Sequence, residues 1–391
     1  MTTIALPARL GSPDRLGLLL VVLGGAAAAL LPLLDLKANR IASGQPRQVW
    51  NAVPLSWALG LTALLVLAAG VAIALRKPLP RLVAGVLGLA GLALAVGHGA
   101  SWLAPPNNPY ARVSLGAGFW VLLLALALLV TDALARLRLA PGTRVLALAL
   151  TVGALGLLLG SGAWNDLSVM REYANRADSF WREGAIHVLL SAGSLAAATA
   201  VGLPLGILAH ERPGLRPPLL QVLNLIQTIP SIALFGILMA PLGFLAAHVP
   251  LAAEIGIRGI GAAPALVALF LYALLPVVAN TTIGLGQVPA ATVDAARGMG
   301  LTERQILAGV ELPLALPVIL TGIRIVLVQS IGLVTVAALI GGGGFGTFVF
   351  QGIGQTATDL ILLGAVPTVA LAFAAAVLLD AAVDLSRRGT P

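Results

Sequence analysis

Long apolar stretches with almost no charge are the feature that most constrains how this chain folds. A helix of about 20 apolar residues crosses the roughly 30 Å hydrocarbon layer of a bilayer. Only 10% of the residues are charged and 59% are hydrophobic, so no segment is polar enough to form a separate water-soluble domain. The sequence therefore predicts an all-α, polytopic membrane protein of about ten transmembrane helices, with approximate bounds 16–34, 54–75, 80–98, 115–135, 145–162, 185–209, 217–243, 263–287, 314–340 and 359–385.

The basic residues predict how these helices are oriented. Of the 23 Lys and Arg residues, fourteen fall on the side that holds both termini and eight on the other side, where the connections are longer. Positive charge concentrates in short cytoplasmic loops, so both termini are predicted to be cytoplasmic. The net charge of +8 is accordingly explained by membrane topology rather than by nucleic-acid binding.

The two halves of the chain differ in polarity. Residues 1–165 contain about five spans built almost entirely from Leu, Ala, Val and Gly, which predicts an N-terminal membrane extension. Residues 166–184 have mixed charge and an amphipathic pattern, which predicts an external linker. Residues 185–391 form the remaining part, in which polar side chains recur on single helical faces.

These polar faces allow two interpretations. A polar face in lipid is unfavourable unless it meets protein or water, so the faces either line a hydrated path or join neighbouring helices by hydrogen bonds. Because four such faces lie in one half of the chain, we favour a path. Arg324 lies roughly 16 Å along its span and should be paired, extend toward the inner surface, or line that path. The candidate path residues are Ser191, Ser194, Asn224, Gln227, Thr228, Ser231, Asn280, Thr321, Arg324 and Thr335.

The inside loop 288–313 has helix signals of its own. Pro289 suits a first helical turn, and Gly300 suits the left-handed conformation that ends a helix. Thr302 and Gln305 have the spacing of a capping box, which predicts that a second short helix begins there. Pro313 is expected to close this unit before the next span. The loop therefore predicts a helix-turn-helix on the cytoplasmic surface that fits into a groove of another protein.

This loop resembles the EAA loop of binding-protein-dependent ABC importer permeases. The family pattern is E-A-A, three residues, Gly, nine residues and I-x-L-P; this chain has Asp294-Ala295-Ala296, then Gly300, then Val310-Glu311-Leu312-Pro313. Asp replaces Glu and Val replaces Ile, while the spacing is kept. The resemblance implies a type I importer core whose loop docks on a separate ATPase subunit, through the candidate coupling residues Asp294, Ala295, Ala296, Gly300, Glu303, Arg304, Leu312 and Pro313.

A narrower resemblance concerns the solute. The segments 227–231 (QTIPS), 315–324 and 337–346 resemble glycine betaine, carnitine, choline and osmoprotectant permeases, here with an added N-terminal membrane extension. The resemblance implies a bacterial inner-membrane protein, a periplasmic or lipid-anchored binding protein, and a second permease chain, identical or different. Arg324 would repel a cation, and aromatic residues are few within the spans, so the resemblance places the high-affinity site on the binding protein.

The sequence argues against chemistry on this chain. It contains no Gly-Lys dipeptide and so no phosphate-binding loop of the GK[ST] type, which means that ATP and Mg would be used by the partner ATPase. The histidines lack metal-ligand spacing and there are no cysteines, so neither an enzyme nor a metal or cofactor site is predicted. The glycine run 341–344 predicts a tight turn.

Two other classes stay open. An ion-gradient-driven secondary transporter would need a carboxylate within a span, whereas Asp359 and Asp380 are expected at or near span ends. A structural or assembly protein without transport activity is the other alternative.

Overall fold

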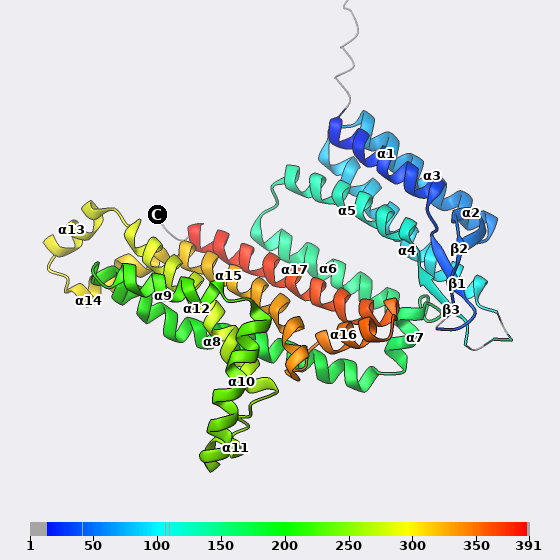
Figure 1. The fold of residues 1–391 in the computed structure, drawn as a ribbon. Helices are drawn as coiled ribbons and strands as arrows, with labels where there is room; N and C mark the ends of the chain where they lie inside the picture. The colour runs from blue at the N-terminus through cyan, green and yellow to red at the C-terminus, as the bar shows by residue number, and fades with distance from the viewer. Residues whose placement is uncertain (1–13, 41, 106, 109, 389–391) are drawn as a thin grey trace, which may run out of the picture. The chain divides into compact units, whose positions relative to one another are not determined.

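The computed structural model describes residues 14–40, 42–105, 107–108 and 110–388, and the chain divides into two compact units (Figure 1). The first unit is formed by the chain up to Leu139 together with Val152–Arg171, and the second by Ala140–Thr151 and the chain from Glu172 onward. The predicted domain boundaries at residues 165 and 184 stay predictions, since two helices contribute residues to both units.

The first unit is a helical bundle with a small sheet at the helix ends. Its three-stranded antiparallel sheet has the order β2-β1-β3 and was not expected from the sequence. Leu34 pairs with Arg47 on one side and with Leu115 on the other, and its side chain is fully buried. The elements are α1 (Arg15–Leu30), β1 (Leu34–Lys37), β2 (Gln45–Arg47), α2 (Val49–Ala52), α3 (Leu55–Ala74), α4 (Pro78–Leu103), β3 (Arg112–Leu115) and α5 (Ala117–Leu137).

A buried arginine holds the helices of this unit together at one end. The guanidinium of Arg81 is 0% exposed and forms ion pairs with Asp14 and with Asp132, the latter at 2.6 Å. It also donates to the carbonyls of Ala72 and Leu75, each at 2.7 Å. The sequence suggested only a topogenic charge at Arg81; the structure shows that its charge is compensated inside the bundle, as a buried charge requires.

The second unit is built around α12. In Figure 1, the inner end of α17 lies at the same end of this unit as α13 and α14, while α10 and α11 project from its side. The helices are α8 (Ala177–Glu211), α9 (Arg216–Thr228), α10 (Ser231–His248), α11 (Pro250–Glu254), α12 (Ala262–Gly286), α13 (Ala290–Gly298), α14 (Glu303–Ile306), α15 (Leu312–Ala337), α16 (Gly346–Gly354) and α17 (Thr358–Arg388). Two further helices, α6 (Pro141–Gly160) and α7 (Ser168–Ala174), contribute residues to both units.

Glycines let α8 and α15 approach α12 closely. A Cβ atom at Gly206 of α8 would lie 2.5 Å from the Thr281 Cβ, and one at Gly322 of α15 would lie 2.7 Å from the Asn280 Cβ. Small residues at helix crossings are the usual means of tight packing in membranes, where lipid removes the hydrophobic driving force between helices. The positions of Asn280 and Thr281 are therefore set by these two contacts.

The membrane-spanning helices come close to the predicted number of about ten and differ in two places, at the first span and at the span 217–243. Within the described residues, nine helices are long and apolar enough to cross a bilayer, and α1 is a shorter apolar helix of 16 residues. The predicted single span 217–243 is wrong as drawn, because the chain leaves helical geometry at Ile229 and Pro230. The proline lacks an N–H and disfavours helical geometry in the residue before it, so α9 ends at Thr228 and α10 begins at Ser231.

Candidate functional site

The loop 288–313 forms an exposed helical hairpin. Helix α13 ends at Gly298, and the turn that follows contains Gly300 in the left-handed region at φ 84°. The predicted capping box forms, with the Thr302 N–H donating to the Gln305 side-chain oxygen at 2.8 Å. Ala296 of the first arm and Ile306 of the second are only 2% and 1% exposed, and α13 packs against α14 and the helical segment that follows it, so the two arms are held together.

Pro313 does not close this hairpin as the sequence suggested. The chain stays helical from Glu303 to Ala337, through a π-helical segment at Leu307–Glu311, and Pro313 lies in the first turn of α15. Because this proline has no N–H, it removes one main-chain hydrogen bond from the continuous helix, directly after the π-helical segment. The second arm of the hairpin and the membrane helix are thus one continuous element, along which movement of the hairpin reaches the membrane.

An ion-pair group lies on the outer surface of the hairpin. Arg297 donates to both carboxylate oxygens of Glu303, at 2.9 and 3.1 Å, and lies 3.5 Å from Asp294. The hydrogen bond and the charge of Glu303 hold the pKa of the Arg297 guanidinium above its usual range. The side chains of Asp294 and Glu303 are 72% and 73% exposed, and Arg304 is exposed beside them. These charges are therefore available to another protein.

The break between α9 and α10 is held by α12. The Gln227 amide donates to the carbonyl of Tyr272 at 2.7 Å, and the Tyr272 hydroxyl donates in return to the carbonyl of Ile229. Ile229 and Pro230 leave helical geometry directly before α10, which is long and apolar enough to span a bilayer. The Tyr272 hydroxyl therefore supplies a donor to a carbonyl at the break. The sequence singled out Gln227 but missed Tyr272.

Most of the remaining predicted path residues form hydrogen bonds within their own helices. The hydroxyls of Ser191, Thr228 and Thr321 donate to carbonyls of their own helices at 2.8, 2.6 and 2.8 Å. Ser194 and the Asn280 amide do the same, at 3.0 and 2.8 Å. Such bonds satisfy the donors without a second helix and leave lone pairs on the hydroxyl oxygens.

Three more path candidates differ in their surroundings. Asn224 is exposed on α9, and Ser231 begins α10 on the far side of the break. Thr335 on α15 has a buried hydroxyl oxygen with no hydrogen-bond partner among the described residues.

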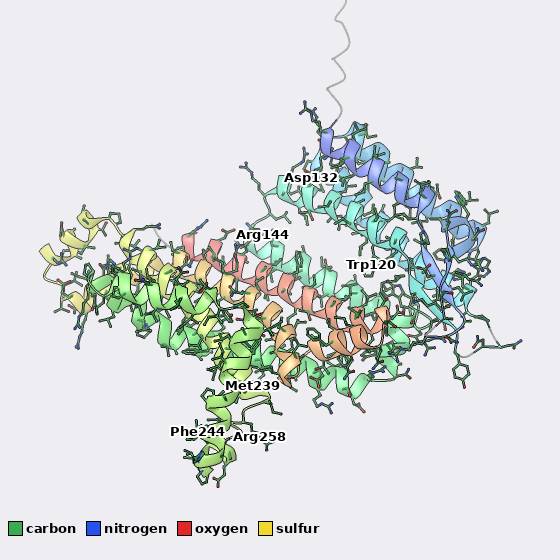
Figure 2. All side chains as sticks on the ribbon, viewed as in Figure 1. Trp120, Asp132, Arg144, Met239, Phe244 and Arg258 are labelled. Atoms are coloured by element: carbon green, nitrogen blue, oxygen red, sulfur yellow. The ribbon has the colours of Figure 1, made fainter. Side chains whose placement is uncertain are left out.

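Arg324 is paired, as its depth required. Its guanidinium forms an ion pair with Asp380 of α17. The sequence placed Asp380 at or near the end of the last span; α17 continues to Arg388, so this carboxylate lies eight residues before the end of the helix. One turn further on, Asp384 pairs with Arg144 of α6 at 2.6 Å; Figure 2 labels Arg144.

The glycine run forms the predicted tight turn. Gly341, Gly343 and Gly344 all have positive φ, between 78° and 86°. Two side chains of α8 hold the turn: Glu183 accepts from the Gly344 N–H at 2.8 Å, and the Nδ1 of His187 accepts from the Phe345 N–H at 3.2 Å. Neither residue was singled out from the sequence, since this contact joins segments more than 150 residues apart.

The projecting arm of α10 and α11 carries apolar side chains at its surface. Phe244 and Arg258 are labelled toward the far end of this arm in Figure 2, and Met239 nearer the bundle. Phe244 is 66% exposed and stacks on His248 with ring centroids 4.0 Å apart. None of the predicted site residues lies on the outer part of the arm.

The chain matches two family profiles that together cover most of its length. Residues 202–390 match the binding-protein-dependent transport system inner membrane component family. Residues 14–170 match the N-terminal domain of the ABC transporter permease YehY. The first match contains the whole hairpin, the break between α9 and α10, and the pair formed by Arg324 and Asp380.

Individual relatives align with the second half of the chain. The osmoprotectant import permease protein OsmW of Salmonella typhimurium is 43% identical over 179 residues, which are 46% of this chain and 78% of that protein. The glycine betaine/carnitine/choline transport system permease protein OpuCD of Bacillus subtilis is 37% identical over 187 residues, 48% of this chain and 75% of that protein. A structure of the MetNI methionine ABC transporter in an inward-facing conformation has 24% identity and a TM-score of 0.45, covering 55% of this chain and 96% of that one.

Proposed function

The chain belongs to the family of binding-protein-dependent transport system inner membrane components, and on that premise we infer that it is the permease subunit of an ABC importer for quaternary ammonium osmoprotectants. One observation carries this inference: the half of the chain that resembles osmoprotectant permeases at 43% identity also contains an exposed helical hairpin continuous with a membrane span. Such an element can receive force at the membrane surface and pass it to the transport path.

The solute is proposed to be glycine betaine or a related quaternary ammonium compound. The names of two relatives, an osmoprotectant permease and a glycine betaine/carnitine/choline permease, support this choice. The path is proposed to follow the polar residues of α8, α9, α12 and α15, including Ser191, Asn224, Gln227 and Asn280. When the importer alternates between its inward-open and outward-open states, the hydroxyl oxygens that now donate to carbonyls of their own helices would accept contacts from the solute through their lone pairs.

The hairpin is proposed to dock on a separate ATPase subunit. Each of its two arms buries one apolar residue, Ala296 or Ile306. Its outer charges are exposed and would contact the ATPase: Glu303, in its pair with Arg297, and Arg304 beside it. ATP and Mg would act in that partner. Because the second arm is continuous with α15, closure of two ATPase subunits would move α15 against α12 and α17.

The remaining partners follow from the family premise. A substrate-binding protein, periplasmic or lipid-anchored, would deliver the solute, and a second permease chain would complete the path. The protein is proposed to lie in the bacterial inner membrane with both termini in the cytoplasm. The hairpin and the inner end of α17 lie at the same end of the second unit, which supports a cytoplasmic C-terminus if the hairpin meets the ATPase (Figure 1).

A secondary transporter is the less favoured alternative. The carboxylate such a transporter would need inside a span is present as Asp380, but it is engaged by Arg324.

The deciding experiment is uptake of glycine betaine by proteoliposomes that contain this chain, its ATPase and its binding protein. We expect uptake that requires ATP and both partners. Uptake driven by an ion gradient without ATP, or no uptake of any quaternary ammonium compound, would refute the proposed function.

A second test addresses the hairpin. Charge reversal of both Glu303 and Arg304 should abolish assembly with the ATPase, whereas reversal of the exposed Arg258, on the predicted outer side, should leave assembly intact. Normal assembly and ATP hydrolysis with both hairpin charges reversed would show that these residues do not seat the loop.

A further inference from the structure

A single ion pair joins α15 and α17 deep within the second unit. Arg324 is twelve residues beyond Leu312, the first residue of α15, which places it roughly 18 Å along that helix. Its partner Asp380 is eight residues before Arg388, roughly 12 Å from the inner end of α17. Arg324 therefore lies about half way along a span that crosses about 30 Å of hydrocarbon, and Asp380 lies in the C-terminal third of its helix.

The pair is only partly covered by this chain. The side chain of Arg324 is 36% exposed and that of Asp380 is 46% exposed. Charged side chains facing lipid at this depth are strongly disfavoured and usually face a bundle interior or a water-filled cavity. The open side of the pair therefore faces water or protein, as expected for a surface of the transport path.

Nearby polar groups are already satisfied or neutral. Asp384, one turn beyond Asp380, is neutralised by Arg144 at 2.6 Å, so it does not compete for Arg324. The Thr321 hydroxyl, one turn before Arg324, donates to its own helix and offers lone pairs. The site thus presents one cation and one anion side by side, with no net charge.

We propose that Arg324 and Asp380 separate to bind a zwitterionic solute, with the guanidinium holding its carboxylate and the Asp380 carboxylate facing its quaternary ammonium group. The inference rests on the proposed osmoprotectant transport and states which members of that class the path accepts. When a betaine enters, each charge exchanges one partner of opposite sign for another, so no charge is left unpaired. A carboxylate and a guanidinium also form a geometrically specific bidentate pair.

A cation without a carboxylate cannot make this exchange. Choline would take Asp380 and leave Arg324 without a counter-charge in a poorly hydrated site, which is the arrangement that buried charges avoid. The repulsion between Arg324 and a cation, considered alone, argues against a direct contact; with Asp380 beside it, the same arginine becomes the recognition group for the carboxylate of a betaine. The pair therefore selects betaines over choline.

The test compares uptake of glycine betaine and choline by the reconstituted importer, using the complete complex. Arg324→Gln should lower the ratio of glycine betaine to choline uptake by about tenfold, because the variant loses the guanidinium that would bind the carboxylate of glycine betaine, a group that choline lacks. Arg324→Lys should keep most of the ratio. Arg144→Gln combined with Asp384→Asn removes the neighbouring pair without leaving a carboxylate free to compete for Arg324; this double variant is the matched control and should leave the ratio unchanged.

A second measurement does not depend on changing the pair. The chain has no cysteine, so Thr321→Cys introduces a single thiol one turn from Arg324. We expect a water-soluble thiol reagent to label it, and glycine betaine to slow the labelling more than choline does at equal concentration.

The outcomes separate the inference from the proposed function. If the unmodified complex takes up neither solute, the proposed substrate class fails and the inference fails with it. If it takes up both and Arg324→Gln changes both rates by the same factor, or if labelling at position 321 is protected equally by both solutes, the pair is a structural link between α15 and α17 and the inference alone is refuted.

Discussion

Replacing Tyr272 by Phe removes one hydroxyl and tests the contact that holds the interrupted helix. The Tyr272 side chain is 6% exposed, and its hydroxyl donates to the carbonyl of Ile229 at the break between α9 and α10. The ring of phenylalanine fills the same space, so the change isolates the hydrogen bond. The bond from Gln227 to the carbonyl of residue 272 is a main-chain contact and remains possible.

The loss of stability expected for Tyr272→Phe depends on the Ile229 carbonyl, which loses its hydrogen-bond donor. A typical intramolecular hydrogen bond contributes about 1 kcal/mol, while a buried acceptor left without a partner costs about 1–3 kcal/mol. Measured values between membrane helices are lower, on average about 0.6 kcal/mol, because the reference state also finds partners. The Ile229 carbonyl follows a helix end and precedes a proline, so it has no helical N–H to turn to. We therefore expect a loss of about 1 kcal/mol.

The assay is thermal unfolding of the purified chain together with solute transported per ATP in the reconstituted complex. A loss of about 1 kcal/mol corresponds to a fall in Tm of about 2–4 °C for a unit of this size. The break should also become less well defined, so solute transported per ATP should fall by a larger factor than ATP hydrolysis does. Tyr110→Phe is the matched control, since Tyr110 is 73% exposed in a loop of the first unit. An equal effect of both variants would refute the reasoning.

Three further perturbations test the packing and the charges. Gly322→Val should destabilise the second unit by about 1–3 kcal/mol in thermal unfolding, because even the Cβ of the new side chain would lie 2.7 Å from the Asn280 Cβ. Gly332→Val, on the same helix but with open space beside it, should have little effect. Arg81→Met should lower the stability of the first unit by about 3–5 kcal/mol, because Asp14 and Asp132 lose their buried partner. A loss no larger than that of Arg136→Met, whose own side chain is 36% exposed, would contradict this. Burial raises the pKa of Asp14, but the hydrogen bond from Arg81 and the charges of Arg81 and Arg136 outweigh it and hold that pKa below 3.8. The stability that the ionised Asp14 gives to the fold is therefore complete above about pH 4 and is lost as the pH falls through the pKa of Asp14 in the folded protein. Asp14→Asn should reduce this acid sensitivity in unfolding measurements.

The hairpin shows how far local signals reach. The glycine at position 300, the capping box at Thr302 and the spacing of the EAA-like pattern depend on residues within a few positions of one another, so the sequence predicted the two arms and the turn between them. Pro313 was misread because a proline near a helix start and a proline that ends a helix look alike in sequence. The π-helical segment before it, which joins the hairpin to α15, has no local signal that we could recognise.

Hydropathy predicted that the region of α9 and α10 is apolar but not that its helix is interrupted. Ten apolar stretches are enough to predict the number of spans, because crossing a bilayer depends on the length and polarity of one segment alone. The same averaging hid the break at Pro230, since a window of apolar residues is just as apolar on both sides of a kink.

Charge pairs depended entirely on folding. The sequence alone predicted a helical membrane protein, the approximate spans and the helical hairpin at 288–313. Each of these depends on residues that are close together in the chain. The contacts between residues about 50 to 160 positions apart depended on the tertiary structure. These are the pair of Arg324 with Asp380, the burial of Arg81 between Asp14 and Asp132, and the bond from the glycine turn to Glu183. Such contacts form when helices pack at particular crossings, and the small residues that set those crossings, such as Gly206 and Gly322, reveal their partners only once the helices are side by side.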